Sequence, residues 1–253
     1  MKHGTCDNRQ DSDQAVISIN SLSKSFDRKV VLRGIDLSVA GGQSVCLCGA
    51  NGAGKSTLLR LIAGLLAPDS GSVAINGHDM HGDPEKAKLE LGMVSHSSMV
   101  YPDLTVVENL KFAADIYGVD AAGRIDELLR GTALASYRFN RASILSRGLL
   151  QWLAVARALV HRPKVLLADE PFTGLDGKAS GRLLEIFDKF TSDGGTIVMV
   201  THDIRVGLQC CDRAVVLDKA QLVFDAATSE IDTERFTRDY LSYAGSPGCG
   251  TSG

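Results

Sequence analysis

The sequence contains no apolar run long enough to cross a lipid bilayer. Its apolar segments, such as "VLLA" and "TIVMV", are far shorter than the roughly 18–20 residues that a membrane-spanning helix requires. The N-terminal stretch "MKHGTCDNRQDSDQ" is polar and lacks the apolar centre of a secretory signal. If the protein works at a membrane, we therefore expect another chain to supply the spanning segments.

A concentration of positive charge is also missing. The formal net charge is −3, and the Lys and Arg residues are scattered along the chain. Proteins that bind nucleic acids usually carry a basic patch or stripe. We therefore expect no nucleic-acid partner.

The six cysteines do not follow the spacing of a disulfide framework or a zinc site. Cys46 and Cys48 alternate within "SVCLCG" and would share one face of a strand, whereas Cys210 and Cys211 are adjacent and poorly placed to bridge. Buried, reduced thiols in a cytosolic protein are the interpretation that this pattern favours.

Hydrophobic patterns divide the chain into regions. Residues 1–14 are polar and are expected to be disordered. Residues 15–40 alternate apolar and polar side chains, which predicts antiparallel strands. A helical lobe is expected over about 97–162, followed by three buried parallel strands, "KVLLADE", "TIVMVTH" and "DRAVVLD". The sequence therefore predicts an α/β domain over residues 15–240 and a flexible, Gly- and Ser-rich tail over 241–253.

A phosphate-binding loop is the most specific motif in the sequence. "GANGAGKST" matches G-x-x-x-x-G-K-[ST] and stands between an apolar strand pattern and an amphipathic helical pattern. Glycines let the backbone approach phosphates, successive N–H groups form an anion nest, and the following helix directs its positive end at the same anion. Lys55 would reach the β- and γ-phosphates of ATP, and Ser56 would hold Mg²⁺. The residues expected to bind the nucleotide here are Gly49, Asn51, Gly52, Ala53, Gly54, Lys55, Ser56 and Thr57.

Two carboxylates and a histidine stand at the ends of later apolar strands. "VLLADEP" ends in Asp169 and Glu170, and "VMVTHD" places His202 at the end of the next strand. Ligands of open α/β sheets bind outside the carboxyl ends of the strands. We expect Asp169 to bind Mg²⁺ and Glu170 to polarise the attacking water. His202 is expected to donate a hydrogen bond to the γ-phosphate. Adjacent strand residues face opposite sides, so Glu170 can share the site only if the chain turns there.

Further motifs resemble those of ABC-type ATPases. "LSRGLLQ" resembles the signature motif of the family, "DEPFTGLD" resembles its Walker B motif and D-loop, and "TH" resembles its H-loop. "SKSF" matches the segment whose aromatic residue, here Phe26, stacks on adenine. The resemblance covers about residues 16–225, with every motif in family order. It implies a P-loop NTPase (RecA-like) core with an N-terminal antiparallel β-subdomain, an inserted helical subdomain, and ATP and Mg²⁺ as ligands.

The resemblance also implies a head-to-tail dimer, either of identical subunits or with a related ATPase. The signature of one subunit then faces the P-loop of the other across the bound ATP. Ser146 is a good helix N-cap, and Gly148 lets the backbone come close. Arg147 departs from the family by replacing the first glycine of the signature pair, and the apolar Trp152 could pack inside the lobe or face a partner. The residues expected to act in trans are Ser146, Arg147, Gly148, Gln151 and Asp176.

His96 lies in "MVSHSSMVYPDLTVVENL", at the position where the family has its Q-loop glutamine. The family glutamine reaches the metal and water when ATP is bound, and the loop after it contacts the membrane partner. A neutral imidazole can also donate or accept a hydrogen bond, and it titrates near neutral pH. His96 is therefore interpreted as a modified nucleotide sensor. A structural histidine is the open alternative, and a metal ligand is disfavoured because no ligand cluster accompanies it.

Family resemblance leads to a functional hypothesis. A single-cassette chain of this kind resembles the ATP-binding subunits that sit peripherally at the cytoplasmic face of the cell membrane and act on integral membrane subunits. The stretch around His96, together with "DEPFTGLD", looks like the haem exporter subunit of cytochrome c biogenesis. Exporters of drugs or polysaccharides share much of this pattern. A soluble ATPase of iron–sulfur cluster assembly is an alternative of another class, whereas translation and DNA-repair types carry a second cassette or a long coiled coil.

Overall fold

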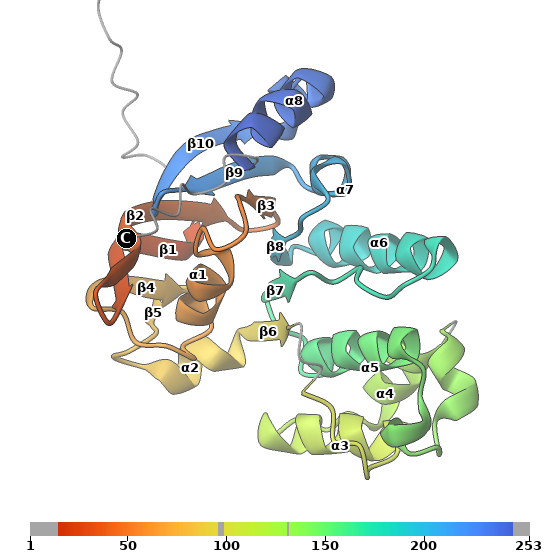
Figure 1. Ribbon diagram of the computed structural model, residues 1–253. Helices are drawn as coiled ribbons and strands as arrows, with labels where there is room; N and C mark the ends of the chain where they lie inside the picture. Colours follow the sequence, from red (N-terminus) through yellow and green to blue (C-terminus); the bar gives the residue numbers. More distant parts are fainter. Residues whose placement is uncertain (1–14, 96–98, 131, 245–253) are drawn as a thin grey trace, which may run out of the picture.

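Two β-sheets organise the protein. The computed structural model describes residues 15–95, 99–130 and 132–244, so the predicted tail 1–14, the sensor residue His96 and the end of the chain lie outside the described part. A four-stranded sheet has the order β2-β1-β4-β5, and a six-stranded sheet has the order β10-β9-β3-β8-β7-β6 (Figure 1).

The four-stranded sheet is the antiparallel unit predicted from the alternating pattern. Strands β1 (Ala15–Phe26) and β2 (Lys29–Ala40) form a hairpin, and β4 (Ser70–Ile75) and β5 (His78–Asp79) complete the sheet. The hairpin turn begins at Asp27, whose φ of 53° is left-handed. Phe26 is thereby held at the tip of the hairpin.

The six-stranded sheet contains the predicted parallel strands at its centre. Its members are β3 (Ser44–Cys48), β6 (Leu91–Val94), β7 (Val165–Asp169), β8 (Thr196–Val200), β9 (Arg213–Asp218) and β10 (Gln221–Ala227). The neighbours β9, β3, β8, β7 and β6 are parallel, and β10 is an antiparallel edge. Parallel strands end on one side of the sheet, so the segments after β3, β7 and β8 meet there.

Two apolar cores cover the two faces of this sheet. Alternate residues of β3 show the division, because Val45 and Leu47 pack with the N-terminal sheet while Cys46 and Cys48 pack with the helices of the opposite face. The helices outside the helical lobe are α1 (Lys55–Ile62), α2 (Pro84–Leu89), α6 (Gly177–Ser192), α7 (Ile204–Cys210) and α8 (Thr233–Ala244). Among the described residues, no helix is long and apolar enough to cross a membrane.

The inserted helical lobe contains α3 (Val106–Ile116), α4 (Ala122–Leu129) and α5 (Arg147–Leu159). It lies beside β6 and apart from the N-terminal sheet (Figure 1). Helix α3 begins with a capping box in which Thr105 and Glu108 pair reciprocally. Trp152 is only 6% exposed and belongs to the core of the lobe, so it packs inside rather than facing a partner.

The C-terminal region differs from the sequence-based expectation. Helix α8 continues to Ala244, so residues 241–244 are helical and do not belong to the flexible tail expected from 241 onward. The helix is fixed by Tyr240, which is buried against the core although most of α8 is polar. Strand β10 was not predicted either, because an edge strand with exposed side chains has no clear alternating pattern.

The four cysteines within the described residues, Cys46, Cys48, Cys210 and Cys211, are free thiols, as predicted. Cys46, Cys48 and Cys211 are buried, and the sulfurs of Cys46 and Cys48 lie 3.4 Å apart on one face of β3. The hydrogen bond with Cys211 raises the pKa of Cys46, and burial raises the pKa of Cys210 to about 11. The neutral thiol is therefore the stable form of Cys46 and Cys210, and buried cysteines act as small apolar groups.

A buried histidine joins the lobe to the central sheet. His161 follows α5 and is 9% exposed, and its Nε2 lies 3.1 Å from the carbonyl oxygen of Leu91 in β6. Its ring stacks on Tyr117 at a centroid distance of 3.6 Å. Burial lowers the pKa of His161 from 6.5 to about 4. The folded protein therefore holds this imidazole neutral under conditions in which the unfolded chain protonates it.

This difference makes stability depend on pH. Between pH 6.5 and about 4 the unfolded chain binds a proton that folded His161 does not, so the free energy of unfolding should fall as pH falls. The loss should reach about 3 kcal/mol at pH 4. Chemical unfolding of the wild type and of His161→Phe across this range measures it. The variant should lose this part of the slope, while His81→Phe at an exposed site should retain it; equal slopes in wild type and His161→Phe would contradict the assignment.

Candidate functional site

The phosphate-binding loop joins β3 to α1 in a conformation that requires glycine. Gly49 has a φ of 152°, and a Cβ there would lie 2.3 Å from the carbonyl oxygen of Leu217. Gly54 has a φ of 110° and precedes α1, and a Cβ there would lie 2.9 Å from the carbonyl oxygen of Val31. Other residues would clash at both positions. The loop backbone therefore packs closely against β9 at Gly49 and against β2 at Gly54, where α1 begins.

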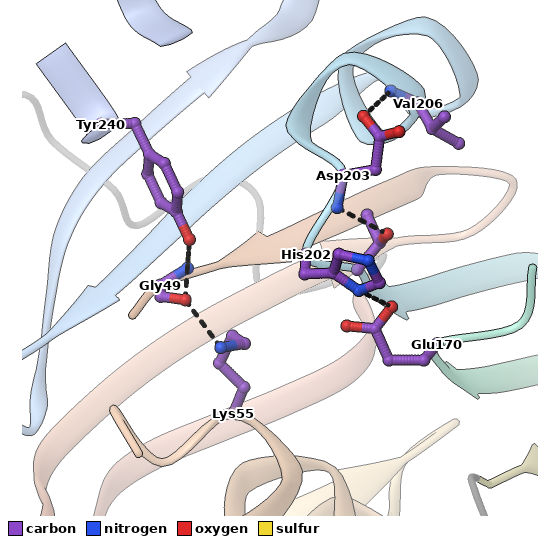
Figure 2. Close-up of polar contacts among 8 residues, drawn as sticks. Gly49, Lys55, Glu170, His202, Asp203, Val206 and Tyr240 are labelled. Carbon is purple, nitrogen blue, oxygen red and sulfur yellow. Dashed lines mark hydrogen bonds and ion pairs between the residues drawn. The ribbon is translucent and has the colours of Figure 1, made fainter. Parts of the chain in front are cut away.

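Lys55 lies folded onto this loop. Its Nζ donates to the carbonyl oxygen of Gly49 at 2.6 Å (Figure 2). It also donates to the carbonyl oxygen of Ala50 at 3.0 Å. Burial lowers the pKa of Lys55, and the nearby carboxylates of Glu170 and Asp169 oppose this by raising it. The ammonium group is thus held by two carbonyl oxygens within the electrostatic influence of Glu170 and Asp169, and it can exchange the carbonyls for phosphate oxygens.

The chain turns between the two carboxylates, as their expected roles require. Asp169 is the last residue of β7 and pairs with Val200 of β8. Glu170 has a φ of 53°, and its N–H donates to the carbonyl oxygen of Val200 at 2.9 Å. A left-handed conformation is uncommon for a residue other than glycine, and it redirects the side chain from the alternation of the strand. Both carboxylates can therefore act near Lys55.

His202 contacts Glu170 directly. Its Nδ1 lies 2.7 Å from Oε2 of Glu170, and the imidazole is largely exposed (Figure 2). The next residue, Asp203, caps α7 by accepting from the N–H of Val206 at 3.2 Å, and its own N–H donates to Oγ1 of Thr201 at 3.1 Å. His202 is thereby positioned between a strand end and a capped helix. The contact uses Nδ1, so Nε2 is the ring nitrogen that a ligand can reach.

Oxygen ligands suited to Mg²⁺ lie at the same strand ends. Ser56 is in the first turn of α1, and Asp169 ends β7. No group of three His, Cys, Asp or Glu side chains that could hold a metal ion occurs among the residues that the structure describes. Mg²⁺ is commonly held by one or two protein oxygens together with substrate phosphates and waters. The Ser56 hydroxyl and the Asp169 carboxylate fit that kind of binding.

The opposite end of the loop adjoins a hollow of about 340 Å³. Its walls come from the loop, from β2 and from the turn after β9. The residues lining it are Lys29, Val30, Val31, Arg33, Ala50, Asn51, Gly52, Ala53, Asp218, Lys219 and Ala220. Phe26 is 43% exposed at the tip of the same hairpin, so its ring is free to stack on a planar base.

The predicted signature residues lie elsewhere in the chain. Ser146 caps α5 by accepting from the N–H of Leu149 at 3.4 Å. Helix α5 lies in the lobe, well separated from α1 (Figure 1). Within one subunit, the signature and the phosphate-binding loop are therefore not brought together.

The signature segment is tied to the segment that follows Glu170. The side-chain amide of Gln151 donates to the carbonyl oxygen of Pro171 at 2.8 Å. A Cβ on Gly148 would lie 3.4 Å from the carbonyl oxygen of Gly174, and the side chain of Arg147 packs against the same glycine. Asp176, predicted to act in trans, caps α6 by accepting from the N–H of Ala179 at 2.7 Å. These contacts connect the start of α5 to the segment that follows Asp169 and Glu170.

One residue of the site was missed by sequence reasoning. Tyr240 of α8 contacts Gly49 through its hydroxyl (Figure 2). A signal exists in "TERFTRDY", where Phe236 and Tyr240 are four residues apart in an otherwise polar helix. That spacing indicates an apolar contact face, but it does not identify the contacted loop.

Comparison with known proteins agrees with this geometry. Residues 32–173 match the family model described as "ABC transporter". The linearmycin resistance ATP-binding protein LnrL of Bacillus subtilis (strain 168) is 30% identical, over 82% of this chain and 68% of the relative. The Nod factor export ATP-binding protein I of Paraburkholderia xenovorans (strain LB400) is 33% identical, over 92% and 77%. The sulfate/thiosulfate import ATP-binding protein CysA of Thermosynechococcus vestitus (strain NIES-2133 / IAM M-273 / BP-1) is 36% identical, over 90% and 69%.

Solved structures show the same fold. An ATP-binding subunit of an ABC transporter superposes with a TM-score of 0.81 at 29% identity, covering 89% of this chain and 94% of that chain. A dimeric post-hydrolysis state of an ATP-binding cassette, bound to ADP and Pi, gives a TM-score of 0.74 at 25% identity, covering 84% and 98%. The fold is therefore that of a P-loop NTPase core with an N-terminal antiparallel sheet and an inserted helical subdomain. Together the loop, the strand-end carboxylates and these matches identify the chain as an ATP-hydrolysing member of the family of ABC transporter ATP-binding domains.

Proposed function

We propose that this chain is the ATP-binding subunit of an ABC exporter. Two such subunits, or one with a related ATPase, hydrolyse ATP at a head-to-tail interface and drive export through separate integral membrane subunits at the cytoplasmic face of the membrane. The observation that carries the proposal is the division of the site. The phosphate-binding loop, Glu170 and His202 share one sheet edge, whereas the signature helix α5 lies apart in the lobe (Figures 1 and 2).

Nucleotide binding begins with an exchange of partners at Lys55. Its ammonium group leaves the carbonyl oxygens of Gly49 and Ala50 and binds phosphate oxygens, which form stronger charge-assisted bonds. The loop N–H groups and the N-terminus of α1 bind the same phosphates. Phe26 stacks on the adenine with its exposed ring.

Hydrolysis depends on the carboxylate side. Ser56 and Asp169 would hold Mg²⁺, which would supply charge neutralisation at the phosphate oxygens when bound. Glu170 orients and polarises the attacking water, and His202 keeps its carboxylate in place through the 2.7 Å contact. His202 then presents Nε2 toward the terminal phosphate.

The second subunit completes the site. Ser146 and Gly148 begin α5, a helix of 13 residues, whose positive end can bind the terminal phosphate of ATP held by the partner. The contact of Gln151 with Pro171 links that helix to the segment after Glu170. Binding of ATP therefore favours the closed dimer. Hydrolysis of ATP removes the contact between α5 and the terminal phosphate, so it favours opening.

A groove between the core and the lobe fits a segment of a membrane subunit. It has a volume of about 250 Å³ and contains apolar side chains from both parts. Leu65, Met99 and Ile116 line it and are at least half exposed, which is unusual for large apolar residues in an unpartnered surface. The segment containing His96 follows Ser95, another residue of its wall.

Two candidate cargoes follow from different observations. Haem is the cargo predicted from the sequence around His96. Export of a drug or a polysaccharide, the alternative given by the sequence, is favoured by the names of the linearmycin resistance and Nod factor export relatives. The sulfate/thiosulfate import protein CysA is also similar to this chain, so likeness of the ATPase domain does not distinguish import from export.

Copurification tests the partner proposal. A tagged form of this chain, expressed in its native cell at native level, should retain polytopic membrane subunits that mass spectrometry identifies. Cytochrome maturation components in the same complex would support haem as cargo, and their absence from a complex with other spanning subunits would support the second candidate. Recovery of a soluble iron–sulfur scaffold instead would contradict the exporter proposal.

Replacement of Glu170 by Gln tests the catalytic assignment. The amide cannot accept a proton from the attacking water, so ATP turnover should fall by roughly 100-fold or more. Binding of ATP should persist, and a stable dimer should accumulate with ATP in size-exclusion chromatography. Glu230→Gln, at an exposed position outside the site, should retain wild-type turnover. Near wild-type hydrolysis by Glu170→Gln would show that another group activates the water.

Replacement of Lys55 by Ala tests the loop. Loss of the charge-assisted bonds to phosphate should weaken MgADP binding by roughly 10- to 100-fold in isothermal titration calorimetry. Lys111→Ala on the exposed face of α3 removes the same charge elsewhere and should leave affinity unchanged. Unchanged affinity in Lys55→Ala would contradict nucleotide binding at this loop.

A further inference from the structure

The C-terminal helix reaches the phosphate-binding loop through one hydroxyl group. Tyr240 of α8 is 8% exposed, and its Oη donates to the carbonyl oxygen of Gly49 at 2.7 Å. Oη of Tyr240 also accepts from the N–H of Gly49 at 3.1 Å. Figure 2 shows the ring of Tyr240 and the side chain of Lys55 meeting at this one glycine.

This contact takes the place of strand pairing. Pairing of β3 with β8 ends at Leu47 and Val200, and pairing with β9 ends at Cys48 and Val216. Gly49 is the next residue, and its backbone groups are buried. A tyrosine hydroxyl is suited to pair with both groups, because it donates and accepts with one atom. The N–H and the carbonyl group of Gly49 are thereby both paired, as they would be if a neighbouring strand continued beside them.

The hydroxyl is delivered from a well-anchored helix. Asp232 precedes α8, and its carboxylate accepts from the N–H of Arg235 at 2.9 Å. The ring of Phe236 packs between Phe224 of β10 and Tyr240, at centroid distances of 5.1 Å and 6.4 Å. Aromatic rings with few rotatable bonds lose little freedom in such an arrangement. The position of the hydroxyl therefore depends on the docking of α8 against β10.

Gly49 shares its carbonyl oxygen between two donors. Nζ of Lys55 lies 2.6 Å from it, and Oη of Tyr240 lies 2.7 Å from it. When Lys55 turns to the phosphates, this oxygen loses one donor. A buried carbonyl without any partner carries a substantial free-energy cost. Tyr240 removes that cost by remaining bonded when Lys55 leaves.

We propose that Tyr240 is a positioning residue that fixes the first residue of the phosphate-binding loop and keeps the Gly49 carbonyl paired while Lys55 binds nucleotide. Docking of α8 then sets nucleotide affinity through the contact of Tyr240 with Gly49. The proposal rests on nucleotide binding at this loop, as given under the proposed function. Helix α8 thereby has a role in the ATPase site that its sequence does not predict.

Tyr240→Phe tests the proposal, because it retains the ring and removes only the hydroxyl. The Kd for MgADP, measured by calorimetry, should rise about five- to tenfold. The KM for ATP should rise by a similar factor while kcat stays within about twofold, since Glu170 and His202 are unaffected. Tyr137→Phe, which removes an exposed hydroxyl from the lobe, should leave both constants unchanged.

A purely structural Tyr240 would give a different result. Tyr240→Phe would then melt at a lower temperature and bind MgADP with wild-type affinity, and that outcome would overturn the proposal. A fall in kcat at constant KM would overturn it as well. Lys55→Ala measured alongside separates the two claims. If Lys55→Ala also binds like the wild type, the loop assignment itself fails, and if it binds weakly while Tyr240→Phe does not, only the role of Tyr240 fails.

A second variant covers the case in which Tyr240→Phe does not fold. Phe236→Leu keeps the hydroxyl but removes the ring packed against Tyr240, which loosens its position. The Kd for MgADP should rise about two- to threefold, less than in Tyr240→Phe. Wild-type affinity in this variant would count against control of the loop by α8.

Discussion

Parallel pairing of β3, β8 and β7 is the constraint on which the site depends. The register places Leu47 beside Val200 and Asp169 beside the same residue, so the strands end together at one edge of the sheet. The loop before Lys55, the carboxylates after β7 and the histidine after β8 then share a small volume. A shift of one residue in this register would turn alternate side chains to the other face and separate these groups. The apolar cores on both faces hold the register, because β3 and β8 are buried along their whole length.

Within this frame, short-range contacts prepare the groups for chemistry. Lys55 rests on the loop carbonyls, Glu170 adopts a left-handed backbone and meets His202, and Tyr240 bonds both backbone groups of Gly49. The contacts of Glu170 with His202 and of Tyr240 with Gly49 join segments that are distant in the sequence. The loop is therefore held from the central sheet and from the C-terminal helix at the same time, while the signature residues stay outside the site of their own chain. We regard this combination of a preorganised half-site and a separate lobe as the basis for ATP-dependent association.

The motifs with strict local requirements were predictable. "GANGAGKST" specifies its own glycine turn and helix start. The buried strands after the lobe are short apolar runs, which are too short for a helix and therefore predict strands. Ser146 was predicted as a helix cap for the same local reason, and it is one. Other features depend on contacts with distant or adjacent segments and have no local sequence pattern. They are the contacts of Gln151 and Asp176 within their own subunit, the edge strand β10, and the extension of α8 to Ala244. The roles of the site residues in binding and turnover stay predictions until the variants are measured.

The sequence by itself determined the phosphate-binding loop, the buried central strands, the α/β class and the family, because glycine spacing, apolar periodicity and helix caps act over a few residues. Only the tertiary structure decided which backbone groups of the loop are paired, and with what. Tyr240 is 191 residues from Gly49, and the polar sequence around Tyr240 does not specify which group its hydroxyl contacts. The packing of α8 against β10 and the end of strand pairing at β3 decide that. A hydrogen bond depends on distances of a fraction of an ångström, and such distances between remote segments exist only once the whole chain has folded.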